Sequence, residues 1–339
     1  MTGHARRTLV TGGCGFIGSH FIRQYLHKHP EREVVNLDLL TYAGNPGNLA
    51  DLAGDPRYRF VRGDVSDAPT VRRAMADCDT VVHFAAESHV DRSLLDAIPF
   101  VRTNVEGTAT LLAAARAAGV DRFLQMSTDE VYGDVAAPRT SLEDDCLLPR
   151  SPYAASKAAA ELLCRSYVES YQLPVIVARC SNVYGPNQFP EKLIPLFVTN
   201  ALAGKSLPVY GNGEQQRDWT YVDDACAAID LLLERGEPSA AYNITAENVR
   251  RNIEVIQTVL AILDRPTSLI QFVRDRPGHD ARYALNADKI RALGWKPAHA
   301  WADAFPRTVR WYAEDPAWWQ QVRNQTFDAY YALQYQHRA

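Results

Sequence analysis

The chain has 339 residues, of which 47% are hydrophobic and 22% are charged, as in an ordinary globular protein with material for one large domain or two smaller ones. Its net charge of −4 argues against a nucleic-acid partner and against an anionic membrane surface. No apolar run approaches the roughly 20 residues that cross a bilayer, and no apolar segment of signal-peptide type follows Met1. We therefore expect a cytoplasmic protein with no membrane partner.

The cysteines predict core positions rather than a metal centre. None of the six forms a C-x-x-C pair, and no histidine and cysteine cluster has the spacing of zinc ligands. Most have apolar neighbours, as small core residues in a reducing compartment do. We expect no metal. The six positions are Cys14, Cys78, Cys146, Cys164, Cys180 and Cys226.

Short apolar runs alternate with amphipathic helical stretches through the first half of the chain. Strands are predicted at 8–12, 33–38, 58–64, 80–86, 122–127 and 175–180. Helices are predicted between them, at 19–29, 68–76, 105–119 and 151–170. This alternation is typical of βαβ units and a parallel sheet. Right-handed crossovers then give an α/β fold of the doubly wound, Rossmann type.

The rhythm breaks after this half, where proline and glycine become frequent. The segment 218–248 again has a strand and helix pattern, which we interpret as a return to the sheet. We predict a dinucleotide-binding domain made of 1–182 with 218–248. The ranges 183–217 and 249–339 would form a smaller, mixed α/β substrate domain.

A glycine-rich turn follows the first predicted strand. Gly12, Gly15 and Gly18 permit a tight turn, a close backbone approach to a pyrophosphate and close helix packing, and a helix N-terminus attracts the anion. A plain loop is the alternative. Asp38 closes the next strand, however, where a carboxylate usually binds ribose hydroxyls. It would repel a 2′-phosphate, which favours NAD over NADP, and Asp64 is placed for the adenine.

The segment "SPYAASK" places Tyr153 and Lys157 four residues apart, on one face of a predicted helix. Ser151 fits the N-cap and Pro152 the first turn. We expect the charge of Lys157 to favour the phenolate of Tyr153, and the positive charge of a nicotinamide to lower the pKa of Tyr153 further. The phenolate could then remove a proton from a sugar hydroxyl. A solvent-exposed pair of side chains is the alternative for this segment alone.

The segment "STDEVYGD" puts Thr128, Asp129 and Glu130 at the end of a predicted buried strand. Together with the glycine turn and the Tyr-x-x-x-Lys helix, it resembles the extended short-chain dehydrogenase/reductase superfamily over nearly the whole chain, and within it the nucleotide-sugar 4,6-dehydratases. The resemblance implies oxidation at C4 of the sugar, loss of water across C5–C6 and return of the hydride to C6. Glu130 would take the C5 proton, and Asp129 would protonate the leaving hydroxyl.

The resemblance also implies further ligand contacts and a homodimer. Thr128 would contact the substrate O4, and the dimer would form through helices that begin near Asn104 and Tyr153. The implied substrate is dTDP-glucose. Besides the glycines, Asp38, Tyr153 and Lys157, the implied NAD contacts are Phe16, Ile17, Asp64, Val65, Ala85, Ala86 and Thr103. The implied substrate contacts are Ser88, Thr128, Asn182, Lys192, Leu193, Pro208, Tyr210, Arg217, Asn252, Arg276 and His279.

Other functions remain open at this point. Sugar 4-epimerases share the glycine turn and the Tyr/Lys pair but usually lack the acidic pair, and related decarboxylases keep the glutamate without the aspartate. Asp129 is therefore the most discriminating residue. A UDP-sugar 4,6-dehydratase is a further alternative, and an NAD-sensing protein without activity is a remote one.

Four other positions lie outside these motifs or depart from them. Val183 stands where the family commonly has asparagine. His83, on an apolar strand, is expected to be a core histidine rather than a ligand. Trp318 and Trp319 are expected to pack the second domain.

Overall fold

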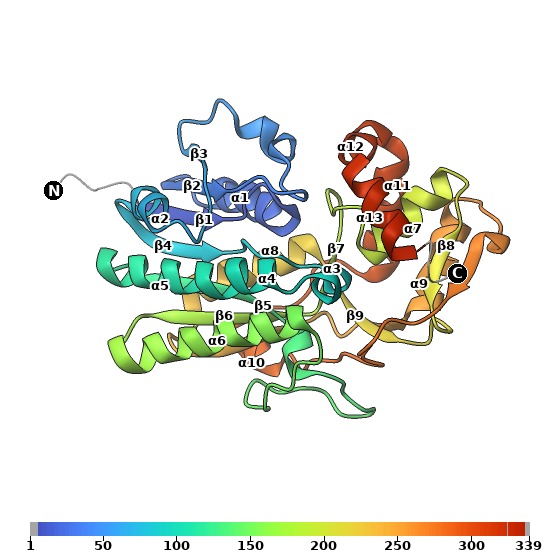
Figure 1. Cartoon of the computed structure of the whole chain (residues 1–339). Coiled ribbons are helices and arrows are strands. Elements are labelled where there is room, and N and C mark those ends of the chain that lie inside the picture. The colour runs from blue at the N-terminus through green and yellow to red at the C-terminus, as the bar shows by residue number, and fades with distance from the viewer. Residues whose placement is uncertain (1–5, 324, 336–339) are drawn as a thin grey trace.

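Seven parallel strands form the central sheet, in the order β10-β6-β5-β4-β1-β2-β3 (Figure 1). The structure, a computed structural model, describes residues 6–323 and 325–335. The predicted Rossmann-type fold is confirmed. The strands are β1 (Arg6–Thr11), β2 (Arg32–Asp38), β3 (Tyr58–Arg62), β4 (Cys78–His83), β5 (Arg122–Thr128), β6 (Val175–Cys180) and β10 (Ala241–Ile244).

Helices cover both faces of this sheet. On one face α1 (Phe16–Lys28) packs beside α8 (Val222–Arg235), and on the other α2 (Ala68–Met75), α5 (Gly107–Ala118) and α6 (Pro152–Tyr171) pack side by side. Neighbouring residues of a strand point to opposite faces: Val10 belongs to the core under α1 and α8, and Leu9 to the core under α2, α5 and α6. Burial on both faces explains why these strands read as continuous apolar runs.

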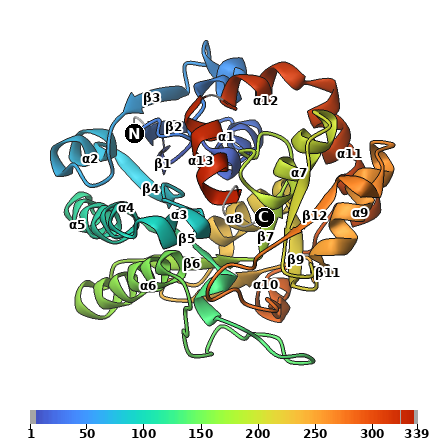
Figure 2. The same cartoon turned by 45° about the vertical axis from the view of Figure 1, so that its right-hand side comes forward.

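Two small sheets and most of the remaining helices lie beyond the carboxyl ends of the large sheet, and Figure 2 turns them forward. One sheet has the order β11-β9-β7 and the other pairs β12 with β8. Their strands are β7 (Asn182–Tyr184), β8 (Leu207–Tyr210), β9 (Gln216–Tyr221), β11 (Val249–Arg251) and β12 (Ile270–Val273). The helices are α3 (Val90–Leu95), α4 (Ile98–Phe100), α7 (Leu193–Leu202), α9 (Asn252–Ile262), α10 (Asp288–Ala292), α11 (Trp301–Glu314), α12 (Pro316–Val322) and α13 (Gln325–Tyr335).

The segment 218–248 returns to the large sheet, but not through its first strand. That strand, β9, pairs with β7 and β11 in a small sheet. The chain rejoins through α8 and β10, which lies parallel to β6. Sequence pattern identifies a strand but not the partner it pairs with.

Several side chains outside the motifs have structural roles. His83 is buried, with Nδ1 bonded to Thr11 Oγ1 at 2.7 Å and Nε2 to Thr108 Oγ1 at 3.2 Å, so it is a core histidine as predicted. Trp319 is buried, and Trp318 donates to Asn48 Oδ1 at 2.8 Å. Over the described ranges, no helix is long and apolar enough to cross a membrane.

Candidate active site

A cleft follows the carboxyl ends of β1 to β6, and most of the predicted site residues line it. All the predicted cofactor residues and all five predicted catalytic residues line it. Ser88, Asn182 and Lys192 line it as well. Because ligands of open α/β sheets bind at this edge, the cleft is where a dinucleotide and a second ligand would meet.

The glycine turn is shaped by backbone contacts. Gly12 has a φ of +70°, and a Cβ there would lie 2.6 Å from the backbone nitrogen of Ala85. A Cβ on Gly18 would lie 2.4 Å from the carbonyl oxygen of Gly12. Gly15 instead stands at the N-cap of α1, where the nearest atom to a Cβ is 3.2 Å away. Gly12 and Gly18 thus shape the turn, while Gly15 leaves the helix N-terminus open to an anion.

Asp38 joins the end of β2 to the glycine turn. Its Oδ2 accepts from the Cys14 N–H at 2.9 Å, and its Oδ1 accepts from the Leu40 N–H at 2.8 Å. Burial raises the pKa of this carboxyl, and the two backbone hydrogen bonds lower it. Asp64 accepts from the Ser66 N–H at 2.8 Å. Both carboxyl groups line the cleft.

Tyr153 and Lys157 project from the first turns of α6. Ser151 caps the helix by accepting from the Ala154 N–H at 3.1 Å, as predicted from the sequence. Lys157 Nζ donates to the Met126 carbonyl oxygen on β5 at 2.5 Å. Both side chains are buried in the wall of the cleft.

The electrostatic prediction for Tyr153 needs correction. We expected Lys157 to lower its pKa, but burial and then the charge of Glu130 raise the pKa of Tyr153, while a hydrogen bond with Thr128 lowers it. The pKa of Lys157 is lowered to about 8 by burial. The phenolate therefore requires a further positive charge in the cleft before it can form near neutral pH.

Asp129 is placed to hold a proton. Thr128 Oγ1 donates to its Oδ1 at 3.1 Å. Its Oδ2 is buried, and within the described part of the chain no hydrogen-bond partner reaches it. Burial and then the charge of Glu130 raise the pKa of Asp129 well above its usual range. This shift favours the protonated form of the carboxyl group, which suits a general acid.

Glu130 lies beside cations instead. Burial raises the pKa of Glu130 overall, and three cations oppose this rise: Arg276, Arg217 and Lys192, in that order. The Tyr283 hydroxyl lies 3.5 Å from its Oε2. The two adjacent carboxyl groups thus have separate environments, which is the arrangement that divides acid from base.

Tyr283 and Asp280 belong to the site but were missed from the sequence. The Tyr283 hydroxyl donates to Asp280 Oδ2 at 2.6 Å, and the Arg217 guanidinium lies 4.2 Å from the centre of its ring. Arg217 also donates to the Asp280 carbonyl oxygen at 2.9 Å. Tyr283 and Asp280 both lie in the segment "DRPGHDARY", which also contains the predicted substrate residues Arg276 and His279. Their position in this segment could have indicated that they belong to the site.

Five residues that were predicted to bind the substrate do not line the cleft: Tyr210, Arg217, Asn252, Arg276 and His279. His279 Nδ1 is bonded to Asp275 Oδ1 at 2.6 Å, and its ring meets that of Tyr210 edge-on. Burial lowers the pKa of His279 to about 4, so it is neutral. Asn182 and Asn252 each have a buried side-chain oxygen with no partner among the described residues. Such acceptors suit a ligand that donates hydrogen bonds.

Leu193 and Pro208 lie where the helix and strand of the substrate side meet the core. Leu193 begins α7 and is partly buried against two of the hydrophobic clusters. Pro208 is buried in β8. Neither of these two residues lines the cleft.

The C-terminal helix α13 adds contacts that no sequence motif indicated. Gln334 Nε2 donates to the Tyr210 hydroxyl at 2.7 Å, and Tyr335 stacks on the Tyr210 ring. That hydroxyl in turn donates to the buried Asp91 at 2.8 Å. Tyr330 is bonded to His89 Nδ1 at 3.2 Å. The far end of the chain therefore packs on residues that flank the cleft.

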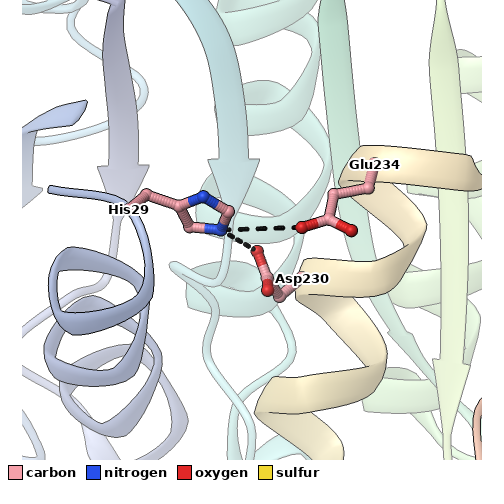
Figure 3. Close-up of side chains that lie close together, drawn as sticks. All are labelled: His29, Asp230 and Glu234. Atoms are coloured by element: carbon pink, nitrogen blue, oxygen red, sulfur yellow. Dashed lines mark hydrogen bonds and ion pairs between the residues drawn. The ribbon is translucent and has the colours of Figure 1, made fainter. Parts of the chain in front are cut away.

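A second charged cluster lies at the opposite edge of the sheet, where α1 ends. Figure 3 shows His29, Asp230 and Glu234 close together, with ligand atoms within 4.8 Å of one another. Lys28 Nζ donates to Asp230 at 2.5 Å and to Glu234 at 2.9 Å, and His29 is bonded to Asp230 at 2.8 Å. These contacts neutralise the carboxylates, so we assign the cluster to the packing of α1 against α8.

Comparison with known proteins identifies the family of this chain. The family model described as GDP-mannose 4,6 dehydratase matches residues 9–307. The dTDP-glucose 4,6-dehydratase of Streptomyces griseus is 50% identical over 323 residues, which cover 94% of this chain and 97% of that protein. The crystal structure of DesIV, a dTDP-glucose 4,6-dehydratase from Streptomyces venezuelae with NAD bound, has a TM-score of 0.91 and 50% identity, and the match covers 93% of this chain and 99% of that one.

A sugar epimerase has the same fold at lower identity. The UDP-glucose 4-epimerase of Thermus thermophilus, in complex with NAD, has a TM-score of 0.84 and 32% identity over 91% of this chain and 99% of its own. Fold and cleft define an NAD-binding enzyme of the extended short-chain dehydrogenase/reductase class. Within that class, the chain belongs to the family whose model is described as GDP-mannose 4,6 dehydratase.

The glycine turn generates a prediction that separates fold from cofactor binding. Gly18→Ala forces a methyl group against the backbone of Gly12 and Gly13, so we expect it to lower the melting temperature clearly more than Gly15→Ala. Gly15→Ala should retain the fold but release most of its NAD during purification, because the methyl group crowds the helix N-terminus. Thermal unfolding and quantification of nucleotide released on denaturation test this. Equal melting temperatures with equal nucleotide content would contradict it.

Proposed function

We propose that this chain is a dTDP-glucose 4,6-dehydratase, a hydro-lyase that forms dTDP-4-keto-6-deoxyglucose and regenerates its NAD in every turnover. The observation that carries the proposal is the different surroundings of two adjacent carboxyl groups. Asp129 Oδ2 is buried with no partner among the described residues, whereas Arg276, Arg217 and Lys192 lower the pKa of Glu130 against the effect of its burial. Both lie in one cleft with Tyr153 and Lys157. An acid and a base at adjacent positions match the elimination of water, a step that epimerisation does not need.

Oxidation at C4 is assigned to Tyr153, Lys157 and Thr128. Bound NAD supplies a hydride acceptor and a positive charge, and that charge provides what Tyr153 needs in order to ionise. Tyr153 then accepts the proton of the C4 hydroxyl, while Thr128 binds O4. Lys157, fixed to the Met126 carbonyl, contributes its charge beside the tyrosine.

Elimination is assigned to the two carboxyl groups. The C4 ketone acidifies the C5–H bond, and Glu130 accepts that proton. Asp129 donates its proton to the C6 hydroxyl, which leaves as water. The hydride would then return to C6 while C5 regains a proton, which Glu130 can supply after exchange with solvent, so that no NAD is consumed overall. Arg217 is proposed to hold the diphosphate, since a guanidinium group binds diphosphate oxygens bidentately. Tyr210 is proposed to lie near the base, and Asn252, Arg276 and His279 to complete the nucleotide site.

The alternatives differ in what they require of this site. A nucleotide-sugar 4-epimerase does not require a general acid at Asp129. An NAD-sensing protein requires none of the five proposed catalytic residues. A UDP-sugar 4,6-dehydratase would use the same chemistry with another base, so substrate comparison must separate it. The division into an NAD domain (1–182 with 218–248) and a substrate domain, and the cytoplasmic location, remain predictions.

We also propose that the protein is a homodimer. Large apolar side chains are exposed on the segment from α3 to the π-helix at Val101–Glu106 and on the neighbouring α6. Ile98 is 72% exposed, and the others are Leu95, Val101 and Leu162. A second copy of the chain would cover them by pairing helices, as in an isologous interface.

Isotope transfer tests the reaction. Purified protein is incubated with dTDP-glucose deuterated at C4, without added NAD. We expect the product to carry deuterium in a new C6 methyl group, because one bound cofactor carries the hydride from C4 to C6, and C5 should acquire hydrogen from solvent. UDP-glucose serves as the comparison substrate. A product that keeps its C6 hydroxyl and has C4 inverted would identify an epimerase.

Substitution of single carboxyl groups separates their roles. Asp129→Asn should reduce turnover about 10²- to 10⁴-fold, the range for loss of general acid catalysis, while enzyme-bound NADH accumulates and C5 exchange with solvent persists. Glu130→Gln should abolish that exchange. Tyr153→Phe, which blocks the first step, should form neither NADH nor exchanged substrate. Normal turnover by Asp129→Asn would place the acid elsewhere.

The dimer has its own test. Ile98→Asp introduces a charge in the exposed apolar segment, so we expect it to give monomers in sedimentation experiments. Phe272→Asp is the matched control, since Phe272 is also exposed (57%) but lies on β12. Monomeric wild-type protein, or dissociation by the control alone, would argue against the proposed interface.

A further inference from the structure

A buried polar network lies directly behind the catalytic turn, and no role in the reaction has been given to it above. It consists of Ser127, Tyr132, Glu161, Arg179 and Asn243, all of which are buried. We call it the Glu161–Arg179 network. Ser127 immediately precedes Thr128, and Tyr132 is the last residue of the 3-10 turn Asp129–Tyr132. The network therefore holds the catalytic turn at both of its ends.

The contacts connect the turn to three strands and one helix. From β5, the Ser127 hydroxyl donates to Glu161 on α6. From β6, Arg179 donates to Glu161 Oε2 through Nε at 2.9 Å and through Nη2 at 2.7 Å. Arg179 Nη1 also donates to the Tyr132 hydroxyl at 2.7 Å. That hydroxyl donates to Asn243 Oδ1 on β10 at 2.8 Å.

Stability alone gives little reason for this arrangement. When an ion pair is buried, the loss of solvation often costs more free energy than the attraction between the charges provides. A protein with well-packed apolar residues in their place is therefore frequently just as stable. Fully satisfied buried networks do, however, fix one geometry. Here the fixed geometry is the separation between the turn that carries Thr128, Asp129 and Glu130 and the helix that carries the tyrosine and lysine.

We propose that Glu161 and Arg179 are positioning residues of the reaction: through Ser127 and Tyr132 they set the catalytic turn against α6, and the Glu161 carboxylate places a negative charge one helical turn from Lys157. Glu161 lies one helical turn after Lys157 on the same face of α6. This inference rests on the proposed dehydratase function and extends it to residues that contact neither substrate nor cofactor.

The surroundings of Lys157 make Glu161 the relevant charge. On α6, Glu161 and then Cys164 raise the pKa of Lys157, against the larger lowering by burial. On β4, His83 is neutral, since burial lowers its pKa to about 3. On β5, Lys157 meets the Met126 carbonyl. Glu161 is thus the leading contribution that favours the charged lysine.

Two small substitutions each remove one hydroxyl group from the network, one at each end of the catalytic turn. Ser127→Ala removes the bond to Glu161, and Tyr132→Phe removes the hydroxyl between Arg179 and Asn243. We expect each to reduce kcat for dTDP-glucose about 10-fold or more, since small misplacements of catalytic groups slow reactions strongly. KM and bound NAD should change by less than about two-fold, and NADH formation in a single turnover should slow with kcat.

Tyr25→Phe is the matched control. The Tyr25 hydroxyl is also buried, and it is bonded to Thr8 at 3.1 Å, away from the cleft. We expect it to alter thermal stability as Tyr132→Phe does but to keep kcat. Wild-type kcat in both network variants, or an equal loss of kcat in the control, would overturn the inference. An inactive wild-type protein would instead contradict the proposed function itself.

The pH dependence tests the charge of Glu161 separately. Lys157 is charged below its pKa, so kcat should fall as the pH rises through that value. Glu161→Gln keeps a hydrogen-bond acceptor but removes the negative charge, which lowers the pKa of Lys157 further. The basic limb of the kcat profile should therefore move to lower pH in Glu161→Gln and stay in place in Ser127→Ala. A basic limb that does not move in Glu161→Gln would overturn the assignment.

Discussion

Burial of two adjacent carboxyl groups in one turn is the constraint on which the site depends. Two buried negative charges at neighbouring positions are costly, so one group takes up a proton and the other must find cations. Asp129 takes the first solution, with burial and Glu130 raising its pKa. For Glu130, Arg276 and Arg217 oppose the rise in pKa that burial causes. The fold turns an unfavourable pair into an acid and a base.

The large sheet makes this division possible because its strands end at one edge. The β5 strand carries the pair to the cleft, and α6 brings the tyrosine and lysine to the same place. The cations come from the small sheets and the loops beyond that edge, so the second half of the chain determines which carboxyl group stays ionised. Catalysis by this site therefore needs both halves of the chain.

Local features of the site were predictable from sequence because they depend on neighbouring residues. The glycine turn, the cap at Ser151 and the Tyr-x-x-x-Lys spacing are of this kind. All the predicted cofactor residues line one cleft. Partners distant in sequence were not predictable. The pairing of β9, the contact of Tyr283 with Glu130 and the packing of α13 on Tyr210 all depend on tertiary structure.

The pKa of Tyr153 failed as a prediction for the same reason. Its spacing from Lys157 suggested a lowered value, but burial and Glu130 dominate. Spacing along a helix defines which side chains are close, whereas desolvation depends on everything packed around them. In this site, the charges that matter most to a group lie on other elements.

Infrared difference spectroscopy tests the central claim most directly, since a protonated carboxyl group has a carbonyl band that a carboxylate lacks. At neutral pH, the spectrum of the wild-type protein minus that of Asp129→Asn should contain this band. Subtraction of the Glu130→Gln spectrum should instead reveal the bands of a carboxylate. Loss of the protonated band in Glu130→Gln, with its survival in Asp129→Asn, would reverse the assignment of acid and base and contradict the account.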